Sequence, residues 1–231
     1  MKPGRLGVGI IGAGRVGPVL GAALAGAGHA IVGVDATGAD AIDRVEALLS
    51  GVPILDAPTL VERSELVLLA VPTEQLAGLV EGLASTGAWQ PGQLVVHTAA
   101  EHGIEILRPA LERGAIPIAL HPAMAFTGTR LDLASLHEAT IAVTAPGPVL
   151  PIGQALAVEM GAEPIIVDEV DRPAYAEALA VARDYADGIV AQALRQLHEL
   201  GVEQPSRVIG GVVRSSVERA LARYPDPPLE P

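Results

Sequence analysis

Cysteine is absent from this chain of 231 residues, which excludes disulfide bonds and thiolate chemistry. Aromatic residues are scarce, with one Phe, one Trp and three Tyr, so few rings are available for stacking on nucleic-acid bases. Lys2 is the only lysine, and the net charge is −12. Because binding to a phosphate backbone needs clustered Lys and Arg, we expect no nucleic-acid partner.

Long uninterrupted hydrophobic runs are also missing. The longest apolar stretch, residues 16–34, is broken by Gly21, Gly26, Gly28 and His29, which is typical of a helix, a turn and a strand rather than a membrane span. The apolar start at residues 6–11 is too short for a secretory signal. We therefore expect a cytoplasmic protein without a membrane partner.

The first two-thirds of the chain alternates β-branched runs with helical patterns, which predicts βαβ units. The expected strands are residues 6–11, 30–34, 66–70, 94–97, 116–120, 140–144 and 164–167. Helices are expected between them, for example at residues 16–25, 39–49, 75–83 and 104–113. The pattern predicts an α/β fold, a Rossmann-type doubly wound parallel sheet followed by a small all-α C-terminal domain.

The character of the chain changes after residue 168. Apolar residues recur at helical spacing up to Gly201, a natural helix stop, and a second helix is expected over roughly residues 206–223. We place a dinucleotide-binding domain at residues 1–168 and a helical substrate or dimerisation domain at 169–231. Because two helices cannot bury their apolar faces alone, we expect a homodimer through them.

A glycine fingerprint follows the first strand. It reads Gly12-Ala-Gly14-Arg15-Val16-Gly17 and opens the first helix. Gly12 permits a tight turn, Gly14 lets the backbone approach a pyrophosphate, and Gly17 lets the helix pack on the strand. The N–H groups at the helix start, from Arg15 and Val16 onward, would bind the phosphates. A glycine-rich structural turn and a methyltransferase-like loop are the alternatives.

Asp35 lies about twenty residues beyond the fingerprint, at the end of the second strand. A carboxylate there accepts hydrogen bonds from ribose hydroxyls and repels a 2′-phosphate, and no Arg follows within the next three residues. We therefore expect NAD as the cofactor, with NADP less favoured. Val71, Pro72 and Thr73 end the third strand and should lie beside the cofactor, although Pro72 could simply stop the strand.

Histidines arrive at the same sheet edge from two other strands. His97, followed by Thr98, should contact the cofactor, and His121 could polarise or protonate a substrate carbonyl. For any single histidine, a hydrogen-bonded strand end is the simpler interpretation. Asp184 on the long helix could assist as a proton donor, or be a solvated residue. No metal-ligand spacing is present, so we expect no metal site.

Four segments carry a family resemblance: "LVLLAVP", "PGQLVVHTAAEHG", "GAIPIALHPAMAFTGT" and "AVTAPGPVLPIGQALAVEMG". They resemble an actinobacterial family of Rossmann-like oxidoreductases of unknown function, often encoded beside pantothenate-synthesis genes. That family lies in the 6-phosphogluconate dehydrogenase-like superfamily, with hydroxyisobutyrate dehydrogenase, ketopantoate reductase and imine reductase as relatives. The resemblance implies a Rossmann domain, a helical domain that often dimerises, and an active site between them.

The chain also departs from that family. Ala99 and Ala100 stand where its members usually carry Ser-Gly, Ala176 replaces a His, and Asp184 stands in place of an Asn. The leading hypothesis is an NAD(P)-dependent oxidoreductase that acts on a small carbonyl, hydroxy-acid or imine substrate, with His121 and Asp184 as catalytic residues. The alternatives are an inactive NAD(H)-binding sensor or scaffold and a prephenate-dehydrogenase-like enzyme.

Overall fold

The computed structural model describes residues 5–224. The chain divides into two compact units, Met1–Ala176 and Glu177–Pro231, with the boundary inside a long helix, α8 (Arg172–Glu199). The first turn of α8, which contains Arg172 and Tyr175, therefore belongs to the unit that holds the sheet. Each unit is described by itself below.

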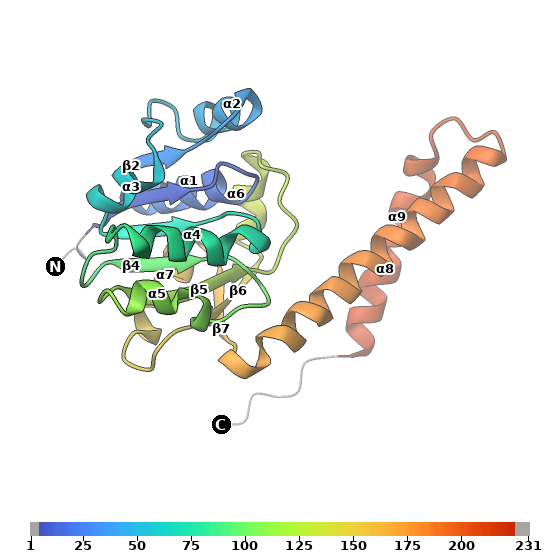
Figure 1. Cartoon of the computed structure of the whole chain (residues 1–231). Helices are drawn as coiled ribbons and strands as arrows, with labels where there is room; N and C mark the ends of the chain where they lie inside the picture. Colours follow the sequence, from blue (N-terminus) through green and yellow to red (C-terminus); the bar gives the residue numbers. More distant parts are fainter. Residues whose placement is uncertain (1–4, 225–231) are drawn as a thin grey trace. The chain divides into compact units, whose positions relative to one another are not determined.

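The first unit is built on a seven-stranded sheet with the strand order β2-β1-β3-β4-β5-β6-β7 (Figure 1). All seven strands expected from the sequence are present, and their ends differ from the expected ones by at most two residues. They are β1 (Gly7–Ile11), β2 (Ala30–Asp35), β3 (Leu66–Leu69), β4 (Leu94–His97), β5 (Ile116–Pro122), β6 (Thr140–Thr144) and β7 (Glu163–Ile166). The order reverses between β1 and β3, as in doubly wound Rossmann-type sheets, which confirms the predicted fold class.

One strand pairing departs from the expected parallel sheet. β1 to β5 are mutually parallel, but β6 runs antiparallel to β5, and β7 is parallel to β6. The connection from β5 to β6 contains only the six-residue helix α6 (Leu131–Leu136), about 9 Å long at 1.5 Å per residue. The chain returns to the edge of the sheet that it left, where the Ala123 N–H donates to the Thr140 carbonyl at 2.9 Å.

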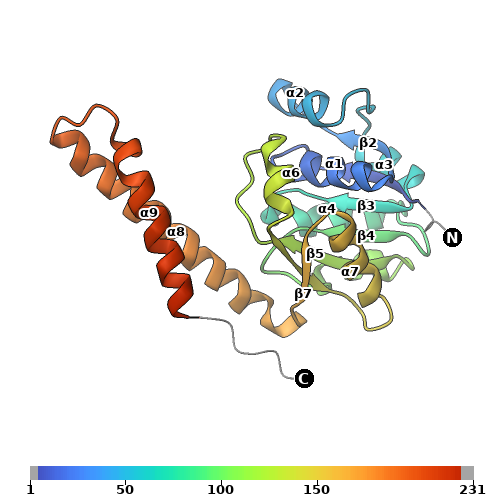
Figure 2. The same ribbon diagram turned by 180° about the vertical axis from the view of Figure 1, so that it is seen from behind.

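Helices cover both faces of the sheet, as Figures 1 and 2 show. Successive strand residues alternate between the two cores: Leu66 and Leu68 of β3 pack with α1 and α7, whereas Val67 and Leu69 pack with α3 and α4. This two-sided burial explains the continuous apolar strands. The remaining helices of the unit are α1 (Gly17–Ala27), α2 (Ala39–Leu48), α3 (Ala57–Arg63), α4 (Thr73–Ser85), α5 (Arg108–Leu111) and α7 (Leu150–Glu159), with short 3-10 turns η1 (Glu105–Leu107) and η2 (Glu169–Asp171).

The second unit consists of the rest of α8 and of α9 (Pro205–Arg223), which confirms a C-terminal helical region. Gly201 adopts a φ of 77° just beyond α8, the left-handed conformation that glycine allows at a helix end. Within the described part of α9 no side chain is fully buried. Between residues 5 and 224, none of the helices combines the length and the apolar character that a membrane span needs.

Candidate cofactor and substrate site

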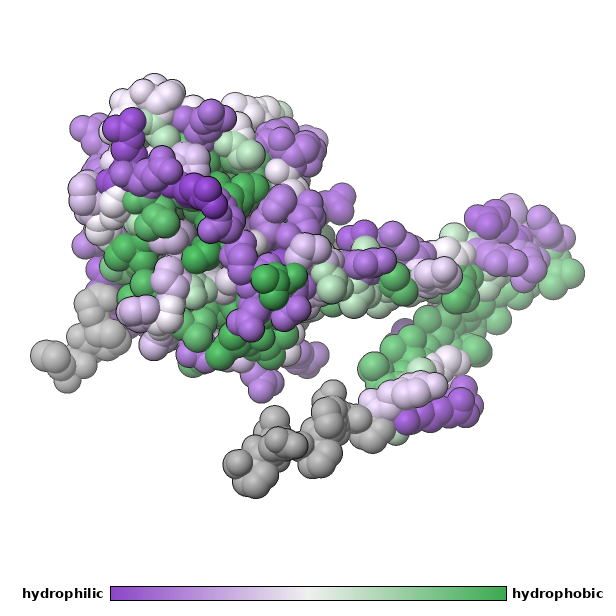
Figure 3. Space-filling model, turned by 60° about the horizontal axis from the view of Figure 1, so that its bottom comes forward, coloured by the Kyte–Doolittle hydropathy of each residue, from purple (hydrophilic) through white to green (hydrophobic). Residues whose placement is uncertain are grey.

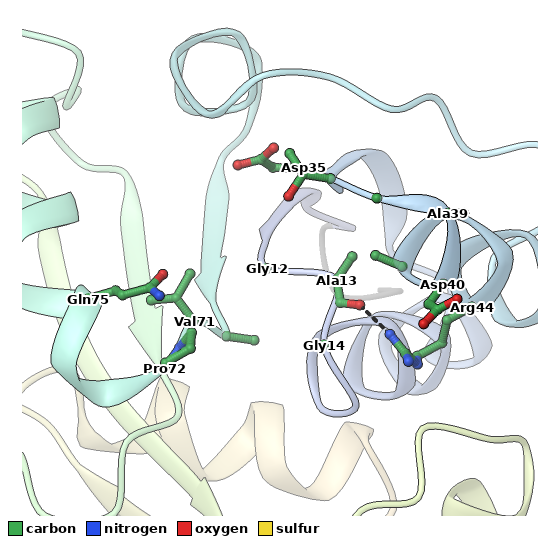
Figure 4. A pocket seen from close by; sticks show the side chains of 14 residues that line it. Gly12, Ala13, Gly14, Asp35, Ala39, Asp40, Arg44, Val71, Pro72 and Gln75 are labelled. Carbon is green, nitrogen blue, oxygen red and sulfur yellow. Dashed lines mark hydrogen bonds between the residues drawn. The ribbon is translucent and has the colours of Figure 1, made fainter.

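A cavity of about 610 Å³ lies at the carboxyl ends of β1, β2 and β3, where the strand order reverses. Its walls come from the glycine loop after β1, from the start of α2, and from the turn after β3 (Figure 4). In open α/β sheets this switch point is the place where ligands bind, and the volume lies in the range of small-molecule sites. The lining residues are Gly12, Ala13, Gly14, Asp35, Thr37, Gly38, Ala39, Asp40, Ala41, Arg44, Ala70, Val71, Pro72 and Gln75.

The three fingerprint glycines meet different physical demands. Gly12 has a φ of 107°, and a Cβ added there would collide with the Ala70 carbonyl. A Cβ on Gly17 would collide with the Gly12 carbonyl and lie 3.1 Å from Ile10 Cγ2, so this glycine lets α1 pack on β1. A Cβ on Gly14 would meet nothing within 4 Å. Gly14 is therefore not required by the protein's own packing, and it leaves space on the cavity wall for a ligand.

The N-terminus of α1 faces the same loop. Val16 occupies the N-cap position without a side-chain cap, and Gly17 and Pro18 begin the helix. The first N–H groups of a helix have no partner within the helix and carry partial positive charge, which suits a phosphate. The observed backbone thus fits the pyrophosphate of a dinucleotide. Arg15 and Val16 belong to this loop, although their side chains do not line the cavity.

Asp35 ends β2 and lines the cavity with a partly buried carboxyl group. Burial raises the pKa of this carboxyl, and the nearby charge of Asp56 raises it further. Asp56 itself caps α3, where its side chain accepts a hydrogen bond from the Thr59 N–H at 2.8 Å. Asp40 adds a second carboxyl group to the cavity wall. The acidic side of the cavity suits the hydroxyl groups of a ribose.

Arg44 is a cavity residue that the sequence analysis missed. Its guanidinium Nη1 donates to the Ala13 carbonyl at 2.7 Å, which ties α2 to the glycine loop (Figure 4). The sequence search for a basic residue covered only the three positions after Asp35, whereas Arg44 comes a helical turn after Asp40. Asp40 and Arg44, at i and i+4 in the helix after β2, lie on the same face of α2, and this spacing could have indicated both.

A second loop packs on Arg44 and on the glycine loop. It includes the "AFTGT" segment after β5, and the buried Asp132 organises it by accepting hydrogen bonds from the N–H groups of Thr127 and Gly128 at 2.9 and 2.7 Å. A Cβ on Gly128 would lie 2.9 Å from Arg44 Nε and 3.2 Å from Arg15 Cα. The loop between β5 and α6 therefore packs against the glycine loop, although it lies outside the first βαβ unit.

The turn after β3 forms the opposite wall of the cavity. Val71 and Pro72 line it together with Gln75, and Figure 4 shows these three residues across from Gly14 and Ala13. Thr73 begins α4 directly behind them and is not a lining residue. The structure thus brings Val71 and Pro72 to the side of the fingerprint.

His97 is fully buried at the end of β4, and both its ring nitrogens have partners. Nε2 lies 2.7 Å from the Gly103 carbonyl, and Nδ1 accepts the Ala99 N–H at 3.2 Å. Burial lowers the pKa of His97 to about 4, with smaller contributions from the charges of Arg172 and the nearby histidines. Both ring nitrogens of His97 are therefore engaged within the protein. Thr98, the next residue, is only partly buried.

His121 lies at the carboxyl end of β5, on the sheet edge that also carries the cavity. Its Nδ1 is 3.0 Å from the Tyr175 hydroxyl, and the two rings meet edge to face with centroids 5.6 Å apart. Burial lowers the pKa of His121 to about 4, and the positive charge of Arg172 contributes. Sequence reasoning found His121. Tyr175, whose helical spacing is typical of a core residue, and Arg172 were not among its candidates.

Asp184, the other predicted catalytic residue, lies on α8 in the second unit. Its exposed carboxylate pairs with Arg183 at 2.8 Å. Within the described residues this is the only ion pair that Asp184 makes.

Residues 1–122 match the family model of the Rossmann-like domain. The chain belongs to the Rossmann-like domain family. The glycine loop, Asp35 and the cavity all lie within this Rossmann-like domain, and so does His121. Residues 139–227 match a second model, a domain of unknown function (DUF2520). No curated protein matches the chain.

Solved structures share the fold of the Rossmann-like domain and of the region beyond it. A candidate NADP oxidoreductase from Bacteroides fragilis superposes with a TM-score of 0.74 at 17% identity, over 93% of this chain and 80% of that one. An imine reductase from Pseudomonas sp. has a TM-score of 0.68 at 14% identity, over 95% and 76%. The 3-hydroxyisobutyrate dehydrogenase of Mycobacterium tuberculosis has a TM-score of 0.63 at 19% identity, over 90% and 71%.

Proposed function

We propose that this protein is an oxidoreductase that binds NAD(H) at the glycine loop and acts on a small carbonyl, hydroxy-acid or imine substrate. The observation that carries the proposal is the cavity at the β1–β3 switch point, with a glycine loop on one wall and the Asp35 carboxyl on another. The nicotinamide ring, when bound, supplies or accepts the hydride. The names of the three similar structures support this reaction class.

The chain's own residues would hold the cofactor in a defined order along the sheet edge. The backbone from Gly12 to Gly17 and the α1 N-terminus would bind the pyrophosphate. Val71, Pro72 and Thr73 would flank the cofactor from the β3 side, as the cavity lining supports for the first two. Thr98, after the structural His97, would contact the part of the cofactor that extends toward β4.

The acidic residues support NAD over NADP. Asp35 and Asp40 both line the cavity, so a 2′-phosphate there would face two carboxyl groups. Arg44 is the cation nearby, but its Nη1 is committed to the Ala13 carbonyl at the glycine loop. We therefore infer that Arg44 acts at the pyrophosphate end and that Asp35 selects the ribose with a free 2′-hydroxyl.

Substrate would bind near His121, which lies two strands from β3 at the same sheet edge. His121 would donate a hydrogen bond to the reacting substrate atom. Asp184, exposed on α8, is proposed as an assisting acid. An inactive NAD(H)-binding protein is the alternative, favoured by Ala99 and Ala100, which place two side chains without polar groups after Thr98.

Calorimetric titration of the intact protein with NADH and with NADPH tests the cofactor proposal. We expect NADH to bind more tightly. We expect Asp35→Asn to weaken NADH binding by about ten- to a hundredfold, because hydrogen bonds to a charged group contribute about 1.5–3 kcal/mol. The same substitution should reduce the difference in affinity between NADH and NADPH.

Asp40→Asn is the matched control, because it removes the same charge from the same cavity wall without touching the end of β2. Its NADH affinity should stay within a few-fold of the wild type. Failure of the wild-type protein to bind either nucleotide would overturn the proposed function. Tight NADH binding without oxidation by any carbonyl or imine would instead identify the inactive sensor or scaffold.

We also propose that the protein forms a homodimer through its C-terminal helices. Large apolar side chains on α8 and α9 are more than half exposed, among them Tyr185, Ile189, Val212 and Leu221. Figure 3 shows apolar residues running along this helical unit. A second copy of the same chain offers a surface of the same character, which supports a symmetric contact.

A further inference from the structure

His121 and Tyr175 form a pair that presents one free nitrogen. Nδ1 of His121 is occupied by the Tyr175 hydroxyl at 3.0 Å. Nε2 hydrogen-bonds none of the described residues, yet it is not among the buried polar atoms without a partner. Nε2 therefore reaches solvent at the carboxyl end of β5, where a substrate atom can approach it.

The direction of the hydrogen bond follows from the chemistry of the two groups. Burial raises the pKa of Tyr175, so the phenol keeps its proton, and the pKa of His121 near 4 keeps the imidazole neutral at pH 7. A neutral imidazole nitrogen is a better acceptor than a phenol oxygen, and the positive charge of Arg172 makes the phenol a better donor. The hydroxyl of Tyr175 therefore donates to Nδ1, and the imidazole proton lies on Nε2.

Arg172 lies behind this pair without an ion-pair partner among the described residues, and the charge of Glu169 acts on it only from beyond 4.0 Å. Its side chain is fully buried, and its guanidinium donates to the Thr144 hydroxyl at 2.7 Å and to the carbonyls of Ala119 and Ala142 at 3.2 and 3.1 Å. The guanidinium carbon lies 5.9 Å from the centre of the Tyr175 ring. Among the described residues no carboxylate lies within 4.0 Å of it, and Nη1 has no hydrogen-bond partner.

We propose that Tyr175 is a positioning residue that holds His121 in the Nε2–H form, and that the Arg172 charge behind the pair selects a carbonyl or alcohol substrate over an imine. This inference rests on the proposed function and deepens it. A carbonyl oxygen gains negative charge during reduction, which a nearby guanidinium stabilises. An imine reacts as a cation, which the same guanidinium disfavours.

The pair also accounts for the proton that the product alcohol needs. As the substrate oxygen takes the proton, the Nε2–H bond breaks and the O–H bond forms. Nδ1 takes the proton of the Tyr175 hydroxyl, so the imidazole stays neutral in its other tautomer. The negative charge moves to the phenol oxygen beside Arg172, and solvent then returns the proton to Tyr175. In alcohol oxidation the same transfers run in reverse.

Nitrogen-15 NMR of the intact, uniformly labelled protein tests the pair without a substrate, because long-range ¹H–¹⁵N correlations distinguish the two tautomers of a histidine. We expect His121 to show a protonated Nε2 and an unprotonated Nδ1 at every pH from 8 to 5. In Tyr175→Phe the preference for this tautomer should be lost. His97, held by the Gly103 carbonyl, is an internal control whose signals should not change. A protonated Nδ1, or a charged His121 at pH 6, would overturn the positioning role.

A second experiment addresses the substrate class. It measures NADH oxidation with a panel of keto acids and aldehydes and with cyclic imines of matching size. We expect NADH oxidation by a carbonyl compound, and a lower kcat in Tyr175→Phe with unchanged NADH affinity. Reduction of imines alone, or of neither class, would overturn the substrate assignment. A wild-type protein that binds no NADH would instead refute the proposed function, and the tautomer result would still decide the role of Tyr175.

Discussion

The two buried histidines should make the stability of the sheet-containing unit steeply dependent on pH. His97 and His121 each have a pKa near 4 in the folded protein, against about 6.5 in an unfolded chain. Between these values the unfolded chain binds more protons, so the free energy of unfolding falls as the pH falls. From pH 7 to pH 5 each histidine should lower it by about 2 kcal/mol, and the two together by about 4 kcal/mol. That loss is a large part of the usual stability of a domain.

His97→Gln isolates one of these contributions. A glutamine amide can still donate to the Gly103 carbonyl, as Nε2 of His97 does, but it does not titrate. The variant should therefore lose only about 2 kcal/mol between pH 7 and pH 5, half of the wild-type loss. A variant that is uniformly less stable remains informative, because the comparison is between pH values. The raised pKa of Asp35 stabilises the folded protein as the pH falls, which is opposite to the effect of the histidines. This contribution cancels in the comparison because both proteins contain Asp35.

Urea titrations at the two pH values measure this effect. Trp89 is the only tryptophan, it is buried in the first unit, and its indole N–H donates to the Val80 carbonyl, so its fluorescence reports on that unit. His137→Gln, at an exposed position at the end of α6, is the control and should keep the wild-type pH dependence. An equal loss of stability in His97→Gln and in the wild type would refute the assignment of His97 as a buried, neutral histidine.

Two further predictions concern the glycine loop and the helical unit. Gly12→Ala should destabilise the protein by more than about 1 kcal/mol in the same urea assay, because φ is 107° and the Ala70 carbonyl blocks a Cβ. Gly14→Ala should leave stability nearly unchanged and weaken NADH binding, since the added Cβ enters open cavity space. Equal losses of stability in Gly12→Ala and Gly14→Ala would contradict the different roles assigned to the two glycines. Light scattering of the intact chain should give about twice the mass of 23.6 kDa, and a monomeric mass would refute the proposed dimer.

The cavity shows how far local sequence reasoning extends. The residues that line it include Gly12, Gly14, Asp35, Val71 and Pro72, which sequence reasoning had selected because they follow strand ends. Parallel strands bring their carboxyl ends to one edge, so residues at these positions meet whatever the details of packing. The inner strands could be located for a similar reason, because burial on both faces imposes continuous apolar runs.

Other features depend on contacts between segments far apart in the chain. The reversal at β6 depends on how the connection after β5 packs, which no residue pattern announces. Arg44 reaches the glycine loop from a neighbouring helix, and Arg172 reaches the carbonyls of β5 and β6 from the start of α8. The histidines at the strand ends were visible in the sequence, but the difference between them was not. Both ring nitrogens of His97 have partners, whereas Nε2 of His121 bonds to nothing within residues 5–224.

The sequence by itself determined the fold class, the glycine loop and the acidic end of β2, because each depends on residues within one βαβ unit. Only the tertiary structure decided which polar groups are buried, which are satisfied, and which stay available for chemistry. Those properties arise when α2, the first turn of α8 and the β5–α6 loop pack within the sheet-containing unit. The free energy of a buried charge or hydrogen bond depends on such partners, which are distant in the chain.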